Sequence, residues 1–63
     1  MDERNQVLAL ADELREAAKT LHESGNAGDA RRSELAAHNI CHEEDMTLEE
    51  AQIIYSTALR QRR

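Results

Sequence analysis

A chain of 63 residues forms one domain at most, and it buries only about 60% of the surface that its unfolded form exposes, so its own core is thin. The hydrophobic content of 40% is nevertheless too high for a disordered acidic tail. The net charge of −5 disfavours contact with nucleic-acid phosphates, and the single cysteine excludes an intrachain disulfide.

The first residues and the lone cysteine indicate the compartment. The sequence starts with the acidic stretch Met1-Asp2-Glu3-Arg4, and no continuous apolar run follows. This pattern predicts neither a signal peptide nor a transmembrane helix. An unpaired Cys41 is typical of a reducing compartment. We therefore expect a cytoplasmic protein without a membrane partner.

Residues 2–24 have the pattern of an amphipathic helix. Apolar side chains recur on the a and d heptad positions, at Val7, Leu10, Leu14, Ala17 and Leu21. Asp2 and Glu3 suit the positive end of the helix dipole, and Gly25 lies where a left-handed C-terminal cap is expected.

A second helix is predicted over residues 29–42, with Asp29 as its N-terminal cap. Its inner face consists of small side chains, at Ala30, Ser33, Ala37 and Cys41. Ile40 lies at one flank of this face, and Leu35 lies well round the other side. Small side chains let a neighbouring helix approach closely but bury little area, so help from another chain is expected.

A third helix is predicted over residues 48–59. Thr47 and Glu50 form a capping-box pattern at its start. Apolar residues then occupy one face, at Leu48, Ala51, Ile54, Tyr55, Ala58 and Leu59. Ile53 projects almost directly opposite them. Because no Gly or Pro separates this helix from the one before it, one long continuous helix is the alternative.

These elements predict an all-α fold in which residues 1–63 form a single small domain, an antiparallel helical hairpin plus a third helix. The thin core predicts assembly as a homodimeric helical bundle, although a tetramer fits the pattern as well. We expect self-association through the first helix and part of the third, and the first helix supplies the seam through Val7, Leu10, Leu14 and Leu21.

The chemically suggestive cluster surrounds Cys41. His38 and His42 stand four residues apart, the spacing at which two imidazoles on a helix can meet one metal ion, and His22 could add a third ligand across the hairpin. However, Cys41 lies about 100° from His42 around the helix, and no second Cys/His pair completes a zinc pattern. We interpret the histidines as surface residues at a helix end and the thiol as a buried small group, and we expect no metal, cofactor or enzymatic activity.

The function that fits this pattern best is a regulatory or adaptor protein that self-associates and binds a protein partner. Ile53 and Tyr55 are the side chains expected on the partner surface, since one is apolar and exposed and the other is amphipathic. Burial of Ile53 at the dimer interface is an equally good interpretation. A small metal-binding module at His38 and His42 remains a further alternative.

DNA binding is the other alternative, and it depends on the C-terminal arginines. Three of the eight basic residues are Arg60, Arg62 and Arg63, which leaves residues 1–59 with five basic against thirteen acidic side chains, a net charge of −8. These arginines, with Arg31 and Arg32, could clamp phosphates. However, the predicted third helix begins with Leu48-Glu49-Glu50, which would push two carboxylates toward a DNA groove.

In its general format the chain resembles the small helical accessory proteins of temperate lambdoid bacteriophages. The resemblance lies in a very short, proline-free helical sequence with one cysteine. It implies a protein that acts by contacting host or phage regulatory proteins, and it assigns no role to any residue.

Overall fold

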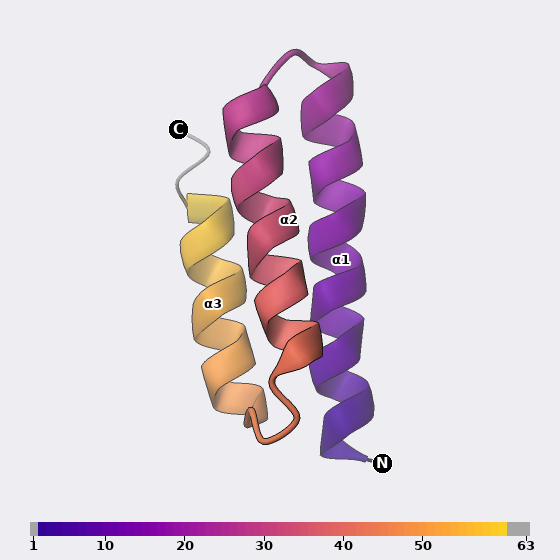
Figure 1. The fold of residues 1–63 in the computed structure, drawn as a ribbon, viewed down its shortest axis with the longest axis vertical. Coiled ribbons are helices and arrows are strands. Elements are labelled where there is room, and N and C mark those ends of the chain that lie inside the picture. The colour runs from indigo at the N-terminus through magenta and orange to yellow at the C-terminus, as the bar shows by residue number, and fades with distance from the viewer. Residues whose placement is uncertain (1, 61–63) are drawn as a thin grey trace.

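The computed structural model describes residues 2–60, and these form three helices that run up, down and up alongside one another (Figure 1). The helices are α1 (Glu3–Glu23), α2 (Ala27–His42) and α3 (Leu48–Arg60). The all-α prediction and the antiparallel hairpin followed by a third helix are therefore confirmed. No helix in the described part of the chain is long and apolar enough to cross a membrane.

The turn between α1 and α2 is built around Gly25, as the sequence predicted. Gly25 has φ +86°, the left-handed conformation that glycine adopts without a steric penalty. Its N–H donates to His22 O at 3.2 Å, and the next N–H, from Asn26, donates to Leu21 O at 2.8 Å. These two bonds satisfy carbonyls that the end of α1 would otherwise leave without donors.

The start of α2 differs from the prediction by two residues. The helix begins at Ala27 with Asn26 as its cap residue, and Asn26 O accepts from Ala30 N–H at 2.9 Å. Asp29 is therefore not the cap. It lies in the first turn, where its carboxylate accepts from Arg32 at 2.7 Å and suits the positive end of the helix dipole.

A real break separates α2 from α3, so the alternative of one continuous helix is wrong. Glu43 is extended, with φ −95° and ψ 97°, and α3 starts only at Leu48, five positions further along the chain. The capping box forms as predicted: Glu50 N–H donates to Thr47 Oγ1 and Thr47 N–H donates to Glu50 Oε1, each at 3.1 Å. These local bonds start α3 as a separate helix, although neither a Gly nor a Pro precedes it.

The core lies along the line where the three helices meet. Its fully buried hydrophobic residues include Val7, Leu14 and Ile40, with small alanines between them. Ser33 is buried too, and its hydroxyl donates to Leu14 O at 2.6 Å, which ties α2 to α1 at the centre of the bundle. Small residues on α2 thus permit close approach of α1, as expected.

The predicted self-association seam is used inside one chain. Val7 and Leu14 are 0% exposed and Leu21 is 5% exposed, because α2 and α3 already cover this face of α1. Leu10 is only partly buried and packs at the edge of the core. Self-association stays a prediction, but Val7, Leu14 and Leu21 offer it no surface, and another face of the molecule would have to carry it.

Candidate protein-docking groove

Two large apolar side chains stand out on the described surface, Leu35 on α2 and Ile53 on α3. Leu35 is 51% exposed and Ile53 is 61% exposed. Each lies away from the inner face of its own helix, as the sequence pattern indicated. The structure adds that they flank the same groove, since both line one hollow between α2 and α3. Sequence reasoning placed each residue on its helix but had no means of bringing the two together.

The apolar part of this groove has a volume of about 320 Å³. The residues that line it are Arg32, Leu35, Ala36, Asn39, Ile53, Ile54, Thr57 and Ala58. Ala36 and Ala58 are nearly buried, and both are small. Because alanines stand where larger side chains would fill the space between the helices, a hollow remains open to an incoming apolar group.

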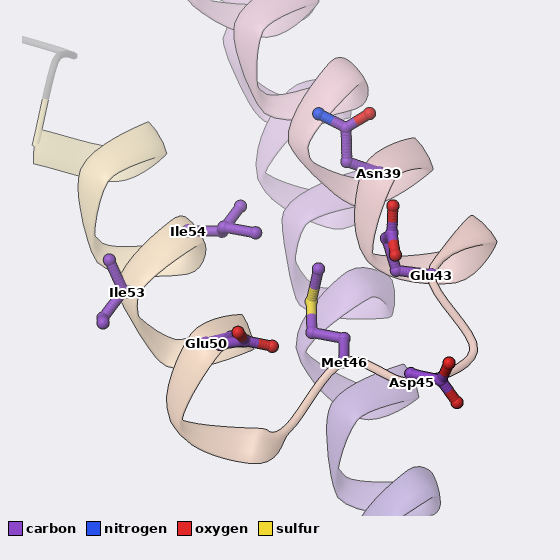
Figure 2. A pocket seen from close by; sticks show the side chains of 7 residues that line it. All are labelled: Asn39, Glu43, Asp45, Met46, Glu50, Ile53 and Ile54. Atoms are coloured by element: carbon purple, nitrogen blue, oxygen red, sulfur yellow. The ribbon is translucent and has the colours of Figure 1, made fainter.

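A second, larger hollow of about 660 Å³ continues the groove toward the α2–α3 connection. Both hollows share Asn39, Ile53 and Ile54, so they form one groove with two ends. Figure 2 shows Ile54 pointing into the gap toward α2, whereas Ile53 projects from the outer side of α3. We call this whole depression the α2–α3 groove.

The end of the α2–α3 groove near the connection is acidic. Glu43, Asp45 and Glu50 line it, with Met46 between them (Figure 2). Within residues 2–59, the ion pairs involve other carboxylates, those of Asp12, Asp29 and Glu34, and none involves these three. The groove therefore combines an apolar half with a negative half, which is the pattern that an amphipathic, partly basic segment would complement.

The first turn of α1 holds this acidic end in place. Arg4 donates to two carbonyls at the C-terminal end of α2, from Nη1 to Glu43 O at 2.9 Å and from Nη2 to Cys41 O at 3.0 Å. Glu3 Oε2 accepts from Leu48 N–H at 2.7 Å, at the start of α3. One turn of α1 thus caps both helix ends that frame the connection, a long-range arrangement that no local sequence signal indicates.

Tyr55 does not share a surface with Ile53. Its hydroxyl donates to Glu13 Oε1 at 2.8 Å, so the ring lies on the side of α3 that faces α1 and is partly buried. The hydrogen bond to Glu13, burial and the nearby carboxylate charge together raise the pKa of Tyr55 above its ordinary value of 10.0. Ile53 therefore lines the α2–α3 groove, whereas Tyr55 joins α3 to α1, and a partner surface at these residues stays a prediction.

The histidine pair remains on the surface of α2. The ring centroids of His38 and His42 are 4.0 Å apart and the rings are tilted by 36°, so the two imidazoles touch as the i, i+4 spacing predicts. His22 does not join them, because it lies beside Glu34, with Nε2 3.4 Å from the carboxylate. Across the described residues, no three His, Cys, Asp or Glu side chains are grouped around a possible metal position.

Cys41 differs from its predicted position. The thiol is partly exposed rather than buried, and its Sγ accepts from Arg15 Nη2 at 3.2 Å. The side chain still packs at the edge of the core. At its C-terminal end, the small-residue face of α2 thus contacts the guanidinium of Arg15 on α1 rather than an apolar side chain.

The candidate nucleic-acid contacts fall largely beyond the described residues. Arg60 is the last residue of α3, and Arg62 and Arg63 lie outside the described part of the chain. Arg32 pairs with Asp29 and also lines the α2–α3 groove.

Comparisons with protein-family models, with curated proteins and with solved structures found no match. The interpretation of the α2–α3 groove therefore depends on its own geometry and charge.

Proposed function

We propose that this protein is a non-enzymatic interaction module with a regulatory or adaptor role, and that the α2–α3 groove is the surface on which it docks another polypeptide. The observation that carries the proposal is the pairing of Leu35 and Ile53 across one groove, each more than half exposed. Single exposed apolar residues are common, but two that line the same hollow form a patch of the kind that marks an interaction site.

The shape of the groove supports a polypeptide as the ligand. Its hollows of about 320 and 660 Å³ lie end to end and are open to solvent, which suits a helical or extended segment better than an enclosed small molecule. An apolar anchor surrounded by polar positions is also the usual composition of a binding hot spot. The charged end would then fix the direction in which the segment lies.

Site-specific photo-crosslinking tests this proposal directly. A photoreactive phenylalanine derivative replaces Leu35 in one protein and Arg31 in a matched control, since Arg31 is exposed on the same helix but does not line the groove. After irradiation in the producing cells, we expect a defined crosslinked product from position 35 and none from position 31. Position 35 giving no product, or both positions giving the same products, would refute the groove as the docking surface.

A further inference from the structure

We propose that the polypeptide docked in the α2–α3 groove is α3 of a second copy of this chain, laid antiparallel so that each copy inserts its Ile53 into the groove of the other. This inference rests on the proposed function, because it names the occupant of the same groove. It also gives the predicted self-association a surface different from the heptad seam of α1, which the core of each chain already uses.

The shapes on α3 are complementary to the groove. Ile53 is a projecting apolar group at the outer lip, and immediately beside it is the hollow above Ile54, Thr57 and Ala58. In an antiparallel pair with its two-fold axis between residues 55 and 56 of α3, Ile53 of one copy lies opposite Ala58 of the other. Each copy therefore supplies one knob and one hole, as a two-fold symmetric interface requires.

The charges select the antiparallel direction. Glu43, Asp45 and Glu50 line the end of the groove near the start of α3, whereas α3 ends at Arg60. An antiparallel α3 brings the arginine end of one copy to the acidic end of the other, twice per dimer. A parallel α3 would instead place the two acidic ends together and the two basic ends together, which is unfavourable.

The size of the surface indicates the strength of this dimer. A specific interface at the small end of the range needs about 1,200 Å² in total, or about 600 Å² from each copy. The chain exposes 4442 Å², and α3, at roughly 1.5 Å per residue over 13 residues, gives a contact about 20 Å long. A contact of this length corresponds to an interface at the small end of the range, so we expect a dimer that dissociates on dilution.

Sedimentation equilibrium of the full chain over micromolar to millimolar concentrations tests the inference. We expect a reversible monomer–dimer equilibrium for the natural sequence. Ile53→Glu should weaken dimerisation by about a hundredfold, because each dimer then loses two buried isoleucine side chains, one from each copy. Gln6→Glu adds the same charge at an exposed position of α1, outside the α2–α3 groove and away from α3, and should change the equilibrium little. Circular dichroism confirms that both variants keep their helices.

A charge-reversal cycle tests the direction of α3. Asp45→Arg and Arg60→Glu should each weaken the dimer by about threefold to tenfold, and the chain that carries both changes should recover most of the affinity. A double variant that dimerises no better than either single variant would overturn the antiparallel arrangement.

The outcomes separate this inference from the proposed function. A natural sequence that stays monomeric at every concentration, while position 35 crosslinks to a different protein, overturns the second copy as occupant and leaves the groove as a docking surface. A dimer that Ile53→Glu does not weaken also overturns the inference. A dimer weakened by Ile53→Glu, with a crosslinked product of twice the chain mass, supports both.

Discussion

Replacing Arg4 with Gln removes the clamp between the first turn of α1 and the end of α2. The guanidinium donates two hydrogen bonds, to Glu43 O at 2.9 Å and to Cys41 O at 3.0 Å, and both carbonyls lie at a helix C-terminus, where the dipole favours a cation. A hydrogen bond from a charged donor contributes about 1.5 to 3 kcal/mol when well shielded. Arg4 is only partly buried, so solvent reduces this value.

For the two bonds together we expect Arg4→Gln to lower the free energy of unfolding by about 1 to 2 kcal/mol. In a domain of this size that loss corresponds to a fall in Tm of roughly 4 to 16 °C. Arg4→Lys keeps the charge but cannot span both carbonyls with a planar fork, so it should recover only part of the loss.

Urea and thermal unfolding followed by circular dichroism measure these differences. Arg31→Gln is the matched control, because Arg31 is exposed and makes no hydrogen bond or ion pair with the described residues. Equal stability of the Arg4→Gln and Arg31→Gln proteins would refute the clamp and with it the long-range capping of α2.

Three further substitutions test the core, the turn and the α1–α3 contact. Leu14→Asp should unfold the protein even at concentrations where it is monomeric, since Leu14 is 0% exposed within one chain; a folded monomer by circular dichroism would contradict this. Gly25→Ala should cost about 1 to 2 kcal/mol through the left-handed backbone alone, because no atom lies within 4 Å of the added Cβ; unfolding midpoints equal to those of the natural sequence would disprove it. The raised pKa of Tyr55 means that the folded state holds the phenol proton more tightly than the unfolded state, so its contribution to stability is complete below pH 10.0 and is lost as the pH rises through the folded-state pKa. When the pH is raised from neutral to above 10.0, the free energy of unfolding measured in urea should therefore fall less for Tyr55→Phe than for the natural sequence. Identical falls in the two proteins would count against the bond to Glu13.

Local signals in the sequence predicted most of the fold. The heptad pattern of α1, the left-handed turn at Gly25 and the capping box at Thr47 each depend on residues within one or two helical turns, and each formed as expected. The outward position of Ile53 followed from the period of α3 in the same way. Periodicity says which face of a helix is apolar, but not which chain covers it.

The remaining features arise from contacts between residues far apart in the sequence. The seam of α1 is covered by α2 and α3 of the same chain, and the small residues of α2 make that packing possible. The bonds from Arg4 to the end of α2 and from Tyr55 to Glu13 join positions about forty residues apart. The α2–α3 groove was missed for the same reason, since Leu35 and Ile53 become neighbours only when the third helix has docked.

The most direct test of the α2–α3 groove as the self-docking surface is a dilution series of amide NMR spectra of the isotope-labelled full chain. We expect concentration-dependent shifts at residues that line the groove, above all Leu35, Ile53 and Thr57, and none at Glu16 or Lys19 on the exposed side of α1. Shifts confined to α1, or spectra that do not change from micromolar to millimolar concentration, would contradict the claim that this chain docks a second copy through the α2–α3 groove.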